Sequence, residues 1–174
     1  MKTQRILAIG FLATLVLPLA AEEKKIPNPA IDYEEFARLS TALASVREKN
    51  RLTEEQFLKM AAEPGTVILD VRSPADFRRI HVKGARNLPL TDFTDASLAK
   101  LIPDKRSRIL IYCNNNFSGQ PGFFPTKRAA VALNVQSFVN LHAYGYTNVH
   151  ELGPYLNVQT TRIILETGEI LVVP

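Results

Sequence analysis

The sequence of 174 residues contains one cysteine, Cys113. A single thiol excludes an internal disulfide, so in an oxidising compartment it is buried and inert, paired with another chain, or used in chemistry. Metal ligands are also scarce, since none of the three histidines has a Cys or His partner at metal-ligand spacing. We therefore expect neither a metal nor another cofactor. The sequence has no repeats, and its 46% apolar content suffices for the core of one domain.

The chain lacks a strong excess of either charge. Its formal net charge is +4, but residues 1–21 include Lys2 and Arg5 and no acidic residue. Removing these two from the 21 basic residues leaves 19 against 17 acidic ones, a net charge of +2. This balance is not that of a nucleic-acid-binding domain, and we expect no nucleic-acid partner.

Residues 1–21 have the pattern of a secretory signal peptide. Lys2 and Arg5 form a positive start, Ile6–Leu17 is apolar, and Pro18-Leu19-Ala20-Ala21 is a small-residue exit. A retained anchor helix is the alternative, but the apolar run is shorter than the roughly 20 residues that span a membrane. We expect cleavage after Ala21, a periplasmic or secreted location, and no stable membrane insertion afterwards.

Periodicity and turn residues predict alternating helices and strands. Thr53 and Gln56 have capping-box spacing, and Ser73-Pro74 is typical of a helix start. The predicted helices cover residues 33–46, 54–63, 95–101 and 127–144, with another short helix beginning at Ser73-Pro74. The predicted strands cover residues 66–70, 108–112 and 148–152, and 84–88 is expected to be a turn into one more short strand. A hairpin is expected from 161–165 and 169–173, around Thr167-Gly168. This order predicts an α/β fold with a doubly wound parallel sheet flanked by helices.

Cys113 follows the most strand-like run, RILIY, and precedes a loop and a helix. In open α/β sheets, sites form beyond the carboxyl ends of the strands. Unpaired backbone N–H groups and a helix dipole at such a position would stabilise a thiolate, or a persulfide anion carried on it. The alternative is a buried, inert thiol that acts as a small hydrophobe at the end of a core strand.

The stretch VILDVRSPADFRRIHVKGARNLPL resembles the signature of the rhodanese-like family. In that signature a strand ending in Asp-x-Arg leads to a Ser-Pro helix and a His-x-x-Gly-Ala turn. The matching positions here are Asp70, Arg72, Ser73, Pro74, His81, Gly84 and Ala85. RILIYC resembles the strand of the family that carries its catalytic cysteine, which places Cys113 at that position, and residues 145–149 resemble the approach to the last strand.

The resemblance implies sulfur transfer: the thiolate takes a sulfur atom from thiosulfate or a persulfide donor and passes it to an acceptor nucleophile, such as a protein thiol. It also implies four regions: a signal peptide (1–21), an extension with an amphipathic helix (22–52), a rhodanese-like domain (53–153) and a C-terminal extension with the hairpin (154–174). Asp70 and Arg72 are expected to form a supporting ion pair that orders the strand end.

The loop after Cys113 is longer than the family's usual loop. The first basic residues after the cysteine are Lys127 and Arg128, and Gly119 stands where a cysteine phosphatase on this fold would need arginine. We expect the anion cradle to be formed by Asn114, Asn115, Asn116, Phe117, Ser118, Gly119 and Arg128.

Two other functions stay open. The long loop 114–126 is compatible with a catalytically weak or inactive module that binds a protein through this loop. A redox role is also open, in which Cys113 forms a mixed disulfide with a partner that supplies the second thiol.

Overall fold

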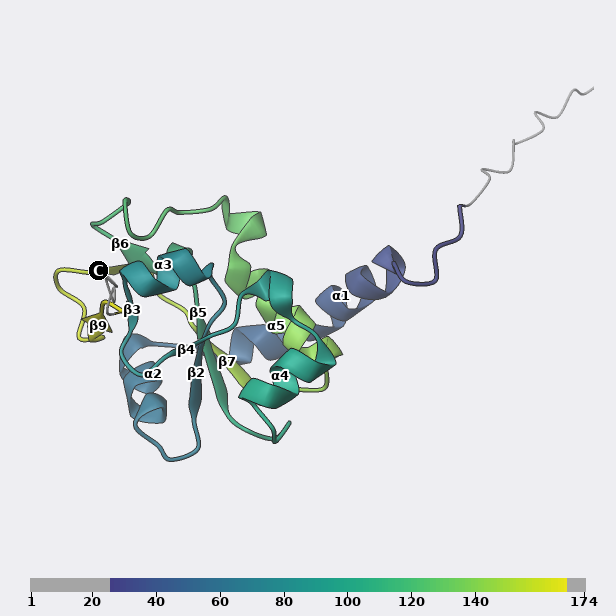
Figure 1. Cartoon of the computed structure of the whole chain (residues 1–174), viewed down its shortest axis with the longest axis horizontal. Coiled ribbons are helices and arrows are strands. Elements are labelled where there is room, and N and C mark those ends of the chain that lie inside the picture. The colour runs from purple at the N-terminus through teal and green to yellow at the C-terminus, as the bar shows by residue number, and fades with distance from the viewer. Residues whose placement is uncertain (1–25, 169–174) are drawn as a thin grey trace, which may run out of the picture. The chain divides into compact units, whose positions relative to one another are not determined.

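The computed structural model describes residues 26–168 and divides into two compact units, residues up to Asp32 and residues from Tyr33 onward. The second unit holds every helix and strand described below (Figure 1). The predicted signal peptide lies outside the described residues. Within residues 26–168, no helix is long and apolar enough to cross a membrane.

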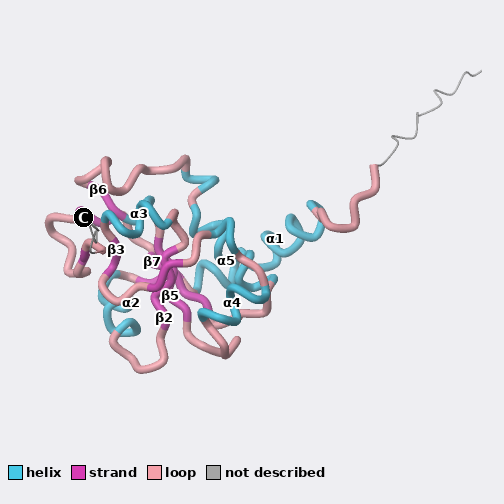
Figure 2. Tube along the Cα trace, viewed as in Figure 1, coloured by secondary structure: helices cyan, strands magenta, loops and turns pink. Residues whose placement is uncertain are grey.

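A five-stranded parallel sheet runs through the middle of this unit (Figure 2). In spatial order its strands are β1 (Arg51–Leu52), β7 (Val149–Leu152), β5 (Ile109–Tyr112), β2 (Val67–Asp70) and β4 (Arg86–Asn87). Asp70 pairs in register with Tyr112, so the carboxyl ends of β2 and β5 lie side by side. Cys113 follows directly, at the edge where open parallel sheets form their sites.

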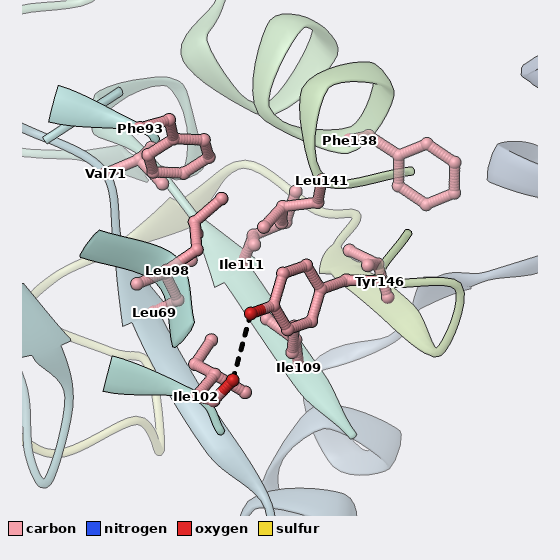
Figure 3. Packing of buried hydrophobic residues seen from close by; sticks show 11 residues of the cluster. Leu69, Val71, Phe93, Leu98, Ile102, Ile109, Ile111, Phe138, Leu141 and Tyr146 are labelled. Carbon is pink, nitrogen blue, oxygen red and sulfur yellow. Dashed lines mark hydrogen bonds between the residues drawn. The ribbon is translucent and has the colours of Figure 1, made fainter. Parts of the chain in front are cut away.

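Helices cover both faces of the sheet, as predicted. Ile109 and Ile111 of β5 pack on one face with Leu141, and Leu110 and Tyr112 pack on the other. This alternation follows from the two-residue period of a strand. Figure 3 shows the first cluster, in which the Tyr146 hydroxyl donates to the Ile102 carbonyl at 2.9 Å. The α-helices are α1 (Tyr33–Lys49), α2 (Glu54–Ala61), α3 (Pro74–Arg79), α4 (Asp95–Leu101) and α5 (Leu133–Ala143).

Local capping accounts for several helix starts. Thr53 and Gln56 form the predicted capping box at α2, and Ser73 caps α3 with Pro74 in its first turn. The predicted start of the last helix at Lys127 is wrong. Residues Ala129–Val131 form a short 3-10 turn, and Ala132 is extended (φ −58°, ψ 136°), so α5 begins only at Leu133.

Two small sheets lie beside the large one. β3 (His81–Val82) pairs antiparallel with β9 (Leu165–Glu166), and β6 (Phe117–Ser118) pairs parallel with β8 (Leu156–Asn157). The tail therefore adds a strand beside β3, whereas the second half of the predicted hairpin, 169–173, lies outside the described residues. The predicted α/β fold, with a central parallel sheet between helices, is confirmed.

Candidate active site

Cys113 lies immediately after β5, in an extended conformation, and its side chain is only 1% exposed. It precedes a 3-10 turn, η2 (Asn114–Asn116), that reverses the chain. The thiol therefore lies at the carboxyl edge of the sheet, between the end of its central strand and the loop that leads to α5.

Backbone N–H groups of three residues, Asn134, Asn115 and Leu133, act to lower the pKa of the Cys113 thiol. One belongs to the turn after β5, and the other two belong to the first turn of α5, where helical N–H groups have no intrahelical acceptor. The positive end of the dipole of this 11-residue helix adds to them. The arrangement can stabilise negative charge on sulfur or on an atom bonded to it.

Burial nevertheless raises the pKa of the Cys113 thiol above its ordinary value. The three N–H groups lower it by less, and the negative charge of Glu151 raises it further. The cysteine is therefore largely protonated at neutral pH, unlike the low-pKa thiolate that sequence reasoning favoured. Burial disfavours the charged form, and here it outweighs hydrogen bonding.

The Asn116 side chain holds this turn in place. Its Oδ1 accepts from the Cys113 backbone N–H at 2.9 Å and from Asn134 Nδ2 at 3.1 Å. Its Nδ2 donates to the Leu152 carbonyl at 2.6 Å. One buried amide thus links the cysteine to α5 and to the end of β7.

Asn115 fixes the far end of the long loop. Its Nδ2 donates to the Lys127 carbonyl at 2.7 Å, and its Oδ1 accepts from the Lys127 N–H at 3.0 Å. The loop that connects Asn115 to Lys127 is therefore closed at its base.

A cavity of about 220 Å³ lies against Cys113. The charged residues that line it are Arg47 at the end of α1, Arg51 of β1 and Glu151 of β7. Arg47 donates to both Glu151 oxygens, at 2.9 Å from Nε and 2.7 Å from Nη2, and Arg51 Nε lies 3.2 Å from Oε1. Burial raises the pKa of the Glu151 carboxyl, which is 2% exposed, and Arg47 opposes that shift.

Asp70 and Arg72 form a buried ion pair at the end of β2. The Arg72 Nη2 lies 2.7 Å from Asp70 Oδ2, and the Arg72 backbone N–H donates to Oδ1 at 2.9 Å. The Tyr112 hydroxyl donates to the same carboxylate and accepts from the Val82 N–H at 3.0 Å. This network joins the ends of β2 and β5 to β3.

The long loop folds down onto this network. Phe124 is 1% exposed, and its ring lies 4.8 Å from the Arg72 guanidinium and 4.6 Å from the Phe117 ring. Phe123 is 36% exposed and stacks under Arg79, which also donates to the Gly122 carbonyl. One of the two adjacent phenylalanines anchors the loop, and the other faces solvent in part.

The structure brings some of the sequence-predicted cradle residues together and separates others. Asn115 and Asn116 line the cavity, while Asn114 lines a neighbouring one of about 300 Å³ beside Arg72 and Lys127. The remaining predicted residues lie outside the lining of the Cys113 cavity: Phe117 and Ser118 in β6, Gly119 against Asn157, and the exposed Arg128 before η3 (Ala129–Val131).

Sequence reasoning missed Leu133, Asn134, Arg47, Arg51 and Glu151. A later helix start would have pointed to the first two, but Ala129–Ala132 has good helix propensity and hides it. No feature of the sequence indicated that Arg47 and Arg51 lie near Cys113, because β1, the strand that brings them there, is only two residues long.

The described residues include no cluster of three or more His, Cys, Asp or Glu that could hold a metal ion. In the same part of the chain, Asn134 Oδ1 and His150 Nδ1 are buried without a hydrogen-bond partner. Because Asn134 lines the Cys113 cavity, its Oδ1 is a hydrogen-bond acceptor without a partner among the described residues at this site.

The chain is similar in sequence to a known protein family and to a known protein. A model of the rhodanese-like domain family matches residues 53–152. The thiosulfate sulfurtransferase PspE of Escherichia coli (strain K12) is 39% identical over 46 residues, which are 26% of this chain and 43% of that protein. The match thus spans less than half the length of that relative.

Solved structures resemble the fold. A thiosulfate sulfurtransferase from Pseudomonas aeruginosa superposes with a TM-score of 0.50 and 22% identity, covering 77% of this chain and 23% of that one. The Alr3790 protein from Anabaena sp. gives a TM-score of 0.49 and 20% identity over 67% of this chain and 80% of that one.

Proposed function

The chain belongs to the rhodanese-like domain family, and on that premise we propose that it is a sulfurtransferase that uses Cys113 as its nucleophile. The observation that carries the proposal is the position of Cys113 at the carboxyl end of β5, against a cavity of about 220 Å³ that Asn134 and Val135 at the start of α5 also line. The sulfur donor is thiosulfate or a persulfide, and the acceptor is a small nucleophile or a protein thiol.

The reaction runs in two displacements. After the thiol has lost its proton to a base in solution, the thiolate attacks the outer sulfur of thiosulfate. A sulfur–sulfur bond forms to Cys113 while the bond to the sulfonate sulfur breaks, and sulfite leaves with the electron pair. The cysteine then carries a persulfide anion, whose terminal sulfur an acceptor nucleophile removes, which regenerates the thiolate.

The backbone donors matter most in the persulfide state. A buried thiolate is costly to form, as the raised pKa of Cys113 indicates, but N–H groups fixed by η2 and α5 need no rearrangement to stabilise the anion that follows. Asn116 holds the turn and the helix start in that geometry.

Turnover tests this proposal. Wild-type protein supplied with thiosulfate and cyanide should form thiocyanate, and Cys113→Ser should form it only at the uncatalysed rate. Circular dichroism of the variant controls for folding. Equal rates for a folded variant and the wild type would rule out Cys113 as the nucleophile.

The second candidate is a binding module that acts through loop 114–126 without turnover. The raised pKa of the Cys113 thiol and the partly exposed Phe123 favour it. If this candidate holds, the wild type will form no thiocyanate, and a Phe123→Ala variant will lose its partner.

We further propose that the mature protein acts in the periplasm. The support is the charged start, apolar run and small-residue exit of residues 1–21. Protein recovered from the periplasmic fraction should begin at Glu22. An N-terminus that retains the apolar run would contradict this location.

A further inference from the structure

We propose that the segment preceding the family-matched domain forms a wall of the active-site cavity, in which Arg47 and Arg51 bind the anionic group of the sulfur donor. This inference rests on the proposed sulfur transfer and specifies the class of donor: a small oxyanion such as thiosulfate. The residues of this wall lie beside Cys113 but outside the range that the family model covers, 53–152.

The wall is attached to the sheet by directional contacts. Arg51 and Leu52 of β1 pair in register with Glu151 and Leu152 of β7. Asn50 adds two links, because its carbonyl accepts from the Glu151 N–H at 3.0 Å and its Nδ2 donates to the Val149 carbonyl at 2.9 Å. The end of α1 is therefore held against the strand that carries Glu151.

Glu151 acts as a positioning residue for the two arginines. Its carboxylate is almost fully buried, and a buried carboxylate is stable only when it is paired. Arg47 binds it in a two-point fashion through Nε and Nη2. Such a bidentate pair fixes the plane of the guanidinium as well as its position.

Arg47 keeps donors for a ligand. Its Nη1 makes no hydrogen bond to any residue in the range 26–168, and its side chain is 28% exposed. Two arginines and one glutamate line the cavity, and Arg51 is shared between Glu151, the exposed Glu48 at 3.3 Å and the Gly153 carbonyl at 3.2 Å. The backbone N–H groups of Asn134, Asn115 and Leu133, which lower the pKa of the Cys113 thiol, also favour an anion here.

The size of the cavity selects for a small ion. Its volume of about 220 Å³ is below the roughly 300 Å³ at which pockets for drug-sized ligands begin. A thiosulfate ion whose sulfonate group contacts Arg47 and whose outer sulfur lies at Cys113 would span this cavity.

Thiosulfate binding to a protein that cannot react tests this inference separately from turnover. In a Cys113→Ser background, calorimetric titration at constant ionic strength should show thiosulfate binding. Adding Arg47→Gln or Arg51→Gln should weaken binding at least about tenfold, because a charge-assisted hydrogen bond or a close countercharge is lost. Arg38→Gln is the matched control, since Arg38 lies on the same helix, is not among the residues that line the cavity, and pairs with Glu35 one turn away.

The same substitutions in the wild-type background should raise KM for thiosulfate while kcat changes little. Arg47→Lys keeps the positive charge but lacks the paired guanidinium nitrogens, so it should bind thiosulfate more tightly than Arg47→Gln and less tightly than the protein with Arg47. If Arg47→Gln fails to fold, Arg51→Gln decides the question.

The outcomes separate the two proposals. Turnover with an unchanged KM in both arginine variants overturns this inference and leaves the sulfurtransferase proposal standing. Thiosulfate binding that depends on the arginines, without turnover in the wild type, supports the site and overturns the proposed function. Absence of thiosulfate binding by Cys113→Ser overturns the inference.

Discussion

Asn116→Ala should remove the support of the active-site turn. The substitution deprives the Cys113 N–H and Asn134 Nδ2 of an acceptor and the Leu152 carbonyl of a donor. A buried polar group left without a partner costs about 1–3 kcal/mol. Because Asn116 lines the cavity, water can reach part of the vacated space, so we expect the free energy of unfolding to fall by about 2–4 kcal/mol.

Urea unfolding measures this loss, and a thermal melt should show a decrease in Tm of about 4–16 °C for a chain of this size. Loading of sulfur onto Cys113 should slow at least about tenfold, because the Asn134 N–H moves with its displaced side chain. Asn157→Ala is the control, since it removes only a 2.9 Å bond from the Gln159 N–H at an exposed site and should cost about 1 kcal/mol or less. An Asn116→Ala protein with wild-type stability and loading would refute this reasoning.

Three further predictions concern the thiol, the buried ion pair and the loop. Because burial raises the pKa of Cys113, its alkylation by a neutral reagent should be slow at pH 7. The rate should still increase above pH ~8.5, where an ordinary free thiol is half ionised. A rate that levels off below that pH would contradict the account. Asp70→Asn should lower the free energy of unfolding, measured in urea, by about 3–5 kcal/mol because the buried Arg72 loses its countercharge. The control Asp104→Asn, at an exposed ion pair, should unfold at the same urea concentration as the wild type. Phe124→Ala should lower the free energy of unfolding by about 3–5 kcal/mol because Phe124 is buried. Phe123→Ala, at a partly exposed position, should lower it far less. Equal losses in the two variants would mean that the loop is not anchored as described.

The sheet and most of the helices could be predicted from the sequence because their signals are local. Ser73 and Pro74 mark a helix start by themselves, and the unbroken apolar run 109–112 is what a strand buried on both faces requires. The position of Cys113 at the carboxyl edge followed from the strand alone.

The composition of the cradle could not be predicted, because it depends on distant segments. The extended backbone of Ala132 delays the start of α5, and this delay places Leu133 and Asn134 in its first turn, where Asn134 lines the Cys113 cavity. No local pattern marks that residue as a helix cap. The partnership of Arg47 with Glu151 spans 104 residues and forms only when β1 pairs with β7.

The direction of the Cys113 pKa shift was equally inaccessible. Helix N-termini lower thiol pKa values, and sequence reasoning placed the cysteine near one. The opposing effect is burial, which arises because the loop, the β7 end and α5 enclose the sulfur together.

The central claim is that Cys113 accepts and holds a sulfur atom in a nest of backbone N–H groups. Intact-mass measurement after incubation with thiosulfate tests it most directly. The account predicts that the wild-type protein gains the mass of one sulfur atom, that Cys113→Ser gains none, and that the adduct disappears on addition of cyanide. A wild-type mass that stays unchanged at alkaline pH, where the thiol is ionised, would contradict it.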